Sequence, residues 1–249
     1  MPGSERLRII ENARIAEDSF RLTLSLEGAS ASAFRPGQFA EIAVPAFSLR
    51  RPLSFCGWDG GSVSFAYTVR GEGTAALSRM KDGELSVILP CGNGFDAEKG
   101  LSAHSVLVIG GGIGCAPLMP LIRELKSLGA EPVAVFGFRD RPQTLFREEL
   151  EQLGVRAVFA YDSEGRTAVS AMKDEGLDGL YFFSCGPAPM MRALCEASSA
   201  PGQCSLETRM GCGYGACMGC SVRLRDRMAR VCKDGPVFEK EEIVWQSLL

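Results

Sequence analysis

The residues with the clearest chemical potential are four cysteines near the C-terminus. Cys212, Cys217 and Cys220 follow the spacing C-x4-C-x2-C, and eleven residues separate Cys220 from Cys232. Thiolates hold iron–sulfur clusters, and this spacing is the plant-type [2Fe–2S] arrangement. Glycines between the thiols let backbone N–H groups turn toward sulfur. The segment therefore predicts a one-electron centre, for which the rest of the chain should supply an electron donor and acceptor.

Two other interpretations of these cysteines stay open. Structural zinc also takes four cysteines, but usually as two C-x2-C pairs or together with histidine, and such a tail could accompany a domain that only senses a nucleotide. A disulfide framework would need a pairing scheme, and the remaining cysteines are scattered without one. These remaining cysteines are Cys56, Cys91, Cys115, Cys185, Cys195 and Cys204.

A glycine cluster forms the second candidate site. A β-branched run at residues 106–109 leads into it, and an amphipathic helix opens at Pro117 after it. The glycines are Gly110, Gly111, Gly112 and Gly114. Helix N-termini bind phosphates, and the sequence fits G-x-G-x-x-P rather than the Rossmann G-x-G-x-x-G. The cluster predicts contact with a nucleotide, and a tight turn without a ligand is the alternative.

Cys185-Gly186-Pro187 follows an apolar strand predicted at residues 180–183. Ligands of open α/β sheets gather at the carboxyl ends of strands, so this small thiol could lie beside a redox ring. A buried structural thiol is an equally good interpretation.

Two short motifs in the first hundred residues could bind phosphate. Arg51, in Arg51-Pro52-Leu53-Ser54, offers a fork for a pyrophosphate, and Gly73-Thr74 offers backbone and hydroxyl donors at a helix start. Each motif alone also fits an ordinary surface arginine or turn. Their order and distance along the chain make the pair more informative.

The elements that must position these groups change in character along the chain. Alternating Phe20, Leu22, Leu24 and Leu26 indicate a half-buried strand. Further short strands are expected at 38–44, 53–55, 63–69 and 85–89, with one helix near 74–80. Close spacing of short strands predicts a small antiparallel barrel.

Beyond residue 100, strands and helices alternate, which predicts a parallel α/β sheet. Strands are expected at 106–109, 133–138, 155–159 and 180–183, and helices at 117–128 and 144–153. The fold class is therefore β plus α/β. We expect an N-terminal barrel over residues 1–100, a nucleotide-binding domain over 101–200 and a cysteine-rich segment over 201–249.

Composition excludes several classes of function. The 249 residues are 46% hydrophobic and 23% charged, as in an ordinary globular protein with a sizeable core. A net charge of −3 gives no reason to expect nucleic acid, and no apolar run approaches the roughly 20 residues of a membrane span. Ten cysteines behind an N-terminus that does not read as a signal peptide favour the cytoplasm. The single histidine, His104, is expected to be structural or exposed, and it offers no hydrolytic constellation.

Taken in order, the motifs RPLS, GEGT, GGGIG with Pro117, CGP and the cysteine segment resemble the ferredoxin–NADP reductase superfamily of flavoproteins. The segment SLETRMGCGYGACMGC, with CGNGF at 91–95, narrows the resemblance to the electron-transfer subunits of class 1B dihydroorotate dehydrogenases. This resemblance implies FAD, a [2Fe–2S] cluster and NAD⁺ as electron acceptor. It also implies a catalytic partner with FMN that oxidises dihydroorotate in pyrimidine biosynthesis, in a heterotetramer of two plus two subunits.

The resemblance also assigns roles to the motifs. It places the flavin and its phosphates at Arg51, Pro52, Leu53, Ser54, Tyr67, Thr68, Gly73 and Thr74. It places NAD⁺ at Gly110 to Gly114 and at Cys185, Gly186 and Pro187. It makes Cys212, Cys217, Cys220 and Cys232 the iron ligands.

Three questions stay open at the level of the sequence. Arg139 and Arg141 beside Asp140 could suit either NAD or NADP, and the resemblance favours NAD. The subunit of a sulfide dehydrogenase or of a ferredoxin-dependent NADP transhydrogenase is the alternative function, and a self-sufficient reductase is a third. We also expect an apolar partner surface around the cysteine loop, at Tyr214, Ala216 and Met218.

Overall fold

Alternating apolar residues close the first part of the chain into a six-stranded antiparallel barrel. The computed structural model describes residues 3–26, 34–101 and 105–248, so His104 lies outside the described residues. The strands are β1 (Gly3–Ala16), β2 (Ser19–Ser25), β3 (Phe39–Ile42), β4 (Arg51–Trp58), β5 (Ser62–Thr68) and β6 (Glu84–Cys91). They pair in the order β1-β2-β5-β4-β3-β6. Leu22 and Leu24 are fully buried in the barrel core, which confirms the predicted alternation.

Helix α1 (Glu72–Arg79) packs against the barrel through Leu77. The Asn12 side-chain amide donates hydrogen bonds to the carbonyl oxygens of Leu77 (2.8 Å) and Met80 (2.9 Å). The Leu77 carbonyl oxygen also accepts the backbone N–H of Met80 at 3.0 Å, and the bonds from Asn12 attach this end of the helix to β1. The helix therefore has a fixed position, and its N-terminus carries the predicted Gly73-Thr74 motif.

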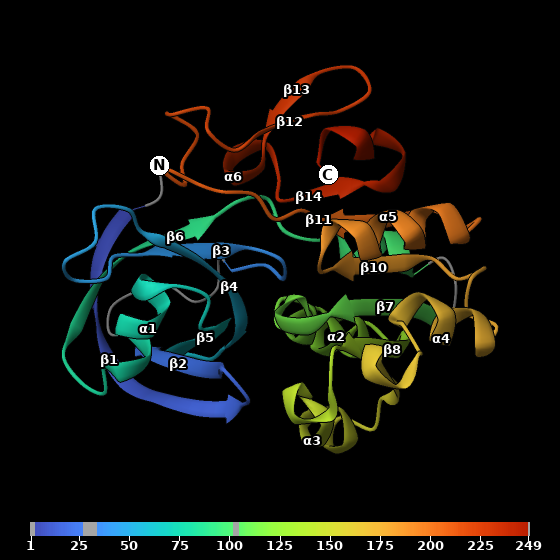
Figure 1. Ribbon diagram of the computed structural model, residues 1–249, viewed down its shortest axis with the longest axis horizontal. Coiled ribbons are helices and arrows are strands. Elements are labelled where there is room, and N and C mark those ends of the chain that lie inside the picture. Colours follow the sequence, from blue (N-terminus) through green and yellow to red (C-terminus); the bar gives the residue numbers. More distant parts are fainter. Residues whose placement is uncertain (1–2, 27–33, 102–104, 249) are drawn as a thin grey trace.

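A six-stranded, mainly parallel sheet with helices on both faces follows the barrel (Figure 1). Its first four strands along the chain are β7 (Ser105–Gly111), β8 (Glu131–Phe138), β9 (Arg156–Tyr161) and β10 (Phe182–Cys185). The helices are α2 (Leu118–Ser127), α3 (Arg147–Gln152), α4 (Ala168–Asp174) and α5 (Ala188–Ala197). Within β7, Leu107 and Ile109 pack into the core with α4 and α5, while Val106 and Val108 pack into the core with α2 and α3. A strand buried on both faces needs such a continuous apolar run.

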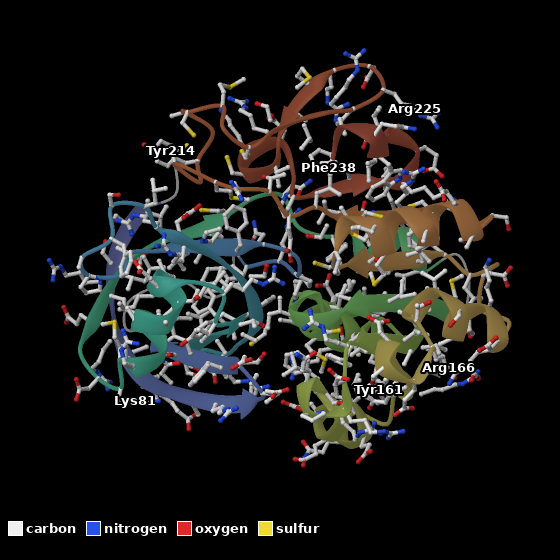
Figure 2. The ribbon with its side chains drawn as sticks, in the orientation of Figure 1. Lys81, Tyr161, Arg166, Tyr214, Arg225 and Phe238 are labelled. Atoms are coloured by element: carbon white, nitrogen blue, oxygen red, sulfur yellow. The ribbon has the colours of Figure 1, made fainter. Side chains whose placement is uncertain are left out.

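The C-terminal segment completes this sheet and then lies across the barrel and the sheet (Figure 1). β11 (Gly202–Ser205) pairs parallel with β10, and β14 (Val237–Glu239) pairs antiparallel with β11. Between them lie the hairpin of β12 (Ser221–Arg223) and β13 (Met228–Arg230) and the short helix α6 (Val231–Asp234). Phe238 lies where this segment meets the sheet (Figure 2). The expected division at residue 200 stays a prediction, and residues beyond it supply two strands of the sheet.

Short 3-10 turns connect several elements. They are η2 (Ala97–Gly100), η3 (Gly112–Cys115), η4 (Arg141–Gln143), η5 (Asp162–Glu164), η6 (Lys240–Glu242) and η7 (Trp245–Ser247). Among residues 3–26, 34–101 and 105–248, no helix combines the length and the apolarity that crossing a bilayer requires.

Several elements differ from the expectations, and α3 and β1 differ for identifiable reasons. The helix expected at 144–153 begins only at Arg147, because Phe146 adopts a left-handed conformation with φ 63° that interrupts it. The long strand β1 was not expected at all. Register shifts after Ile9 and after Arg14 interrupt its pairing with β2 and break the two-residue period.

Candidate functional site

The four predicted iron ligands form two pairs in the C-terminal segment. The Sγ atoms of Cys220 and Cys232 lie 3.2 Å apart, and both residues are buried. In the other pair the backbone N–H of Cys217 donates to Sγ of Cys212 at 3.4 Å. Four cysteine thiols with this spacing suit a two-iron cluster.

The loop between the two pairs aims backbone donors at sulfur. Besides Cys217, Ala216 donates to Sγ of Cys212 at 3.3 Å, and Gly219 donates to Sγ of Cys217 at 3.4 Å. Hydrogen bonds to cluster sulfurs and solvent exposure are the means by which a protein tunes an iron–sulfur centre. The thiol chemistry and these donors together fit a [2Fe–2S] cluster.

The two pairs differ in electrostatics. Burial would raise the pKa of Cys212, but the backbone N–H groups of Cys217 and Tyr214 outweigh it and lower the pKa to about 6. Burial and the neighbouring Cys220 raise the pKa of Cys232 to about 12. Iron binds thiolates, so binding to the inner pair must release protons.

A buried carboxyl lies beneath this loop. Glu41 on β3 is 1% exposed, and its Oε1 has no hydrogen-bond partner. The side chain packs against Gly213, where a Cβ would collide with it. Burial, followed by the negative charge of Cys212, raises the pKa of Glu41 to about 7. The positive charges of Arg50 and Arg51 oppose this rise.

A cleft opens where the barrel, the α/β sheet and the C-terminal segment meet. From the barrel it is lined by Pro52, Leu53, Ser54, Tyr67, Thr68 and Thr74. The α/β part contributes Ile113, Ala116, Pro117 and Cys185, and the C-terminal segment contributes residues 205–208. The motif residues predicted to contact the flavin therefore gather in one place, although they come from β4, β5 and α1.

Arg51 and Gly73 lie beside this cleft rather than in its lining. A Cβ at Gly73 would collide with the guanidinium of Arg51, so the glycine lets this guanidinium lie directly against the start of the helix. The guanidinium also donates to the carbonyl oxygen of Leu49 at 2.8 Å and stacks 5.1 Å from the ring centroid of Phe47. The arginine is thus held next to the N-terminus of α1, where an anion would meet both groups.

A second cleft lies over the carboxyl ends of the parallel strands and is continuous with the first through Thr68, Arg70 and Ile113. Gly111, Gly112 and Pro187, three of the residues predicted to contact a nicotinamide nucleotide, line it. Cys185 lines the first cleft instead, and Gly110, Gly114 and Gly186 are in the lining of neither cleft.

The two nucleotide motifs touch each other. A Cβ at Gly114 would lie 2.6 Å from the carbonyl oxygen of Cys185, well inside ordinary contact, and a Cβ at Gly186 would lie 2.9 Å from the backbone nitrogen of Gly111. Glycine at these positions lets β7 and β10 bring their ends together. Burial raises the pKa of Cys185 well above its usual range, so this residue presents a thiol to the cleft.

Sequence reasoning did not identify the contribution of the C-terminal segment to the cleft. Leu206, Glu207 and Thr208 line it next to Cys185. The available signal was their place directly after the end of β11, at the edge of the sheet where ligands gather. Glu41 gave no local signal, because its contact with the cysteine loop joins residues 172 positions apart (213 minus 41).

Comparisons with known proteins agree with this geometry. The sequence profile of the iron–sulfur cluster binding domain of dihydroorotate dehydrogenase B matches residues 207–244. The dihydroorotate dehydrogenase B (NAD(+)) electron transfer subunit of Bacillus caldolyticus is 37% identical, over 98% of this chain and all of the relative. The subunit of the same name from Fusobacterium nucleatum is 32% identical, over 96% of this chain and 98% of the relative.

Solved structures show the same architecture. The NADH-dependent reduced ferredoxin-NADP oxidoreductase structure, described in connection with flavin-based electron bifurcation, superposes with a TM-score of 0.85 at 28% identity. That match covers all of this chain and 93% of the other. Phthalate dioxygenase reductase has the same fold, with a TM-score of 0.68 at 20% identity over 90% of this chain and 87% of the other.

The barrel, the α/β sheet and the four-thiol segment define an oxidoreductase of the ferredoxin–NADP reductase fold with an iron–sulfur domain. This confirms the predicted fold class. The sequence of this chain is similar to one group of relatives over nearly their full length. The chain belongs to the family of dihydroorotate dehydrogenase B electron transfer subunits, as the sequence motifs indicated.

Proposed function

We propose that this chain carries electrons from the FMN of a dihydroorotate-oxidising partner, through a [2Fe–2S] cluster and FAD, to NAD⁺ in pyrimidine biosynthesis. The observation that carries the proposal is the junction of three sites in one small molecule. The C-terminal segment carries the two thiol pairs and also lines the cleft of the RPLS motif, and that cleft shares Thr68, Arg70 and Ile113 with the cleft of the glycine cluster. A flavin exchanges single electrons with a cluster and a hydride with a nicotinamide, and the protein supplies binding and orientation.

For the flavin, we propose that Pro52, Leu53 and Ser54 hold the ring together with Tyr67 and Thr68. Tyr67 has a fixed orientation, because its hydroxyl donates to Asn12 Oδ1 at 3.0 Å and its ring stacks on Phe20. The Arg51 guanidinium and the Gly73-Thr74 backbone would hold the pyrophosphate. A fixed guanidinium fork and a helix N-terminus both favour anions.

For the second nucleotide, Gly111 and Gly112 would face the phosphates, with Gly110 and Gly114 providing the close turn. Cys185, Gly186 and Pro187 would border the nicotinamide. Discrimination against NADP would follow from the charges around the cleft. Arg141 pairs with Glu164, with 3.0 Å between Nη2 and Oε2, and Asp162 lines the cleft together with Arg139. A 2′-phosphate in this cleft would meet two arginines, Arg70 and Arg139, and three acids, Glu17, Asp18 and Asp162.

For the partner, we propose an FMN-containing catalytic subunit that docks on the cysteine loop, in an assembly of two plus two subunits in the cytoplasm. Tyr214 and Met218 are 51% and 55% exposed, and Ala216 between them is also exposed. Tyr214 lies at the outer edge of the loop, on the side of the barrel (Figure 2). Exposed apolar side chains on a loop that carries metal ligands favour a protein contact there, because electron transfer requires close approach.

The subunit of a ferredoxin-dependent NADP oxidoreductase is the second candidate, because a structure of that description superposes over the whole chain. Anaerobic co-purification with each candidate partner separates the two. The proposal expects a complex with iron, acid-labile sulfide, FAD and FMN that reduces NAD⁺ with dihydroorotate. Material without iron and flavin, or a loaded complex that ignores dihydroorotate but reduces NADP⁺ with ferredoxin, would exclude the proposed function.

A further inference from the structure

Two cysteines outside the cluster segment also lie in contact. Cys195 is on α5 and Cys204 is on β11, and their Sγ atoms are 3.8 Å apart. A disulfide bond is about 2.05 Å long, so the sulfurs need to approach by about 1.8 Å, which side-chain rotation with a small shift of the helix can supply. We propose that Cys195 and Cys204 are a thiol modification site that closes to a reversible disulfide, separate from the iron ligands.

The two thiols differ in access, as an attacking and a resolving thiol should. Cys204 is fully buried in the sheet, where Ser184 on β10 and Phe238 on β14 are its register partners. Cys195 is partly exposed on its helix. Among the six cysteines that are not predicted ligands, Cys195 alone has this exposure, and the other five are buried. A reagent in solution therefore meets Cys195 first.

The surroundings of Cys195 favour a reactive thiolate. The pKa of Cys195 is lowered, chiefly by the hydrogen bond from Cys204 and also by the positive charge of Lys240. Burial and the negative charges of Glu241 and Glu196 act in the opposite direction. Lys240 is held in place, because its Nζ donates to the carbonyl oxygens of Ser198 (2.8 Å) and Ala200 (2.6 Å). The same contact raises the pKa of Cys204, which stays protonated. Thiolates at partly exposed positions near a lysine are the reactive ones.

A low-molecular-weight disulfide is a sufficient oxidant. The Cys195 thiolate attacks one sulfur of oxidised glutathione, forming a mixed disulfide and releasing one glutathione thiolate. The thiol of Cys204 loses its proton and attacks Cys195 Sγ, and the second glutathione leaves as a thiol. The protein dithiol is oxidised by two electrons, and the glutathione disulfide is reduced by the same two.

The new bond would tie α5 to the strand that enters the flavin cleft. Cys204 directly precedes Ser205 and Leu206, which line that cleft, and α5 begins after Pro187, which lines the second cleft. Closing the bond therefore changes the rigidity of one wall of the redox site without using any iron ligand. Flavin fluorescence provides a readout of this wall that is independent of turnover.

The test uses the anaerobic holoprotein in glutathione buffers of increasing oxidation, with iodoacetamide trapping and peptide mass spectrometry. In reduced buffer we expect one alkylated cysteine, Cys195. In oxidised buffer we expect no alkylation, a peptide pair joined through Cys195 and Cys204, and unchanged iron content. Reduction should restore the single alkylation.

Three variants make the outcome specific. Cys204→Ser should stop at a stable glutathione adduct on Cys195, Cys195→Ser should remain unmodified, and Cys56→Ser, which changes a buried thiol elsewhere, should behave like the parent protein. The proposal is overturned if the parent protein keeps the adduct on Cys195 without resolving it, if no buffer oxidises the pair, or if the crosslinked peptide contains another cysteine. The parent protein alone decides these outcomes, even where a variant fails to fold.

Discussion

Replacement of the buried Glu41 by glutamine should remove a pH dependence from the stability of this protein. The carboxyl has an ordinary pKa of 4.5, and burial, followed by the charge of Cys212, raises it to about 7 in the folded protein. At about 1.4 kcal/mol for each tenfold change in proton affinity, this difference corresponds to about 3 kcal/mol of the free energy of unfolding. Because Glu41 is 1% exposed, solvent screens little of that energy.

The sign follows from proton binding. Between pH 4.5 and about 7 the folded protein keeps a proton on Glu41 that the unfolded chain has released, so the free energy of unfolding falls as the pH rises through this window. Below pH 4.5 the contribution is complete, and above about pH 7 it is lost. Glutamine has the same shape and never carries the charge. The variant should therefore match the parent protein most closely near pH 5 and exceed its stability by up to about 3 kcal/mol at pH 8.

Urea denaturation followed by far-ultraviolet circular dichroism, at half-unit steps from pH 5 to pH 8 with FAD at one fixed concentration, measures this difference. Glu11→Gln is the matched control, since Glu11 is an exposed carboxylate on barrel strand β1. The control should show the same pH profile as the parent protein. A constant offset between Glu41→Gln and the parent protein across this range would refute the reasoning.

Three further substitutions separate the sites. Cys220→Ser should abolish the visible iron–sulfur absorbance and the dihydroorotate-dependent reduction of NAD⁺ while FAD stays bound in a stoichiometric amount. Full NAD⁺ reduction by this variant in the complex would contradict the proposed path of electrons through the cluster. Gly114→Ala places a methyl group 2.6 Å from the Cys185 carbonyl oxygen, an overpacking of about 1–3 kcal/mol, so KM for NAD⁺ should rise by about one to two orders of magnitude with flavin content unchanged. Gly179→Ala, where a Cβ meets nothing within 4 Å, is its control. Arg51→Leu should weaken FAD retention by at least about tenfold on gel filtration, as expected for the loss of a charged hydrogen bond worth about 1.5–3 kcal/mol, and equal FAD retention would remove Arg51 from the pyrophosphate site.

Much of the fold could be predicted because its signals are local. The alternation around Leu22 and Leu24, the apolar run of β7 and the glycines that end it depend on neighbours in sequence. The spacing of Cys212, Cys217 and Cys220 is of the same kind, because one loop must wrap one cluster. Local patterns of this sort determined the barrel, the α/β sheet and the iron-binding segment.

Other features depend on long-range pairing, which no local pattern encodes. The bulges in β1 hide its strand period, and β14 joins the sheet only because β11 offers it a free edge. The approach of Arg51 to Gly73 beside the cleft likewise requires the whole barrel.

The sequence by itself determined which chemical groups this protein carries and the order in which they occur, because ligand spacing and strand period are properties of neighbouring residues. The tertiary structure alone decided which groups meet. It placed Glu41 beneath the cysteine loop, set Cys195 against Cys204, and brought Leu206 into the cleft beside Cys185. The physical reason is that packing a barrel, a sheet and a connecting segment around common cores fixes contacts between residues that the chain itself keeps far apart.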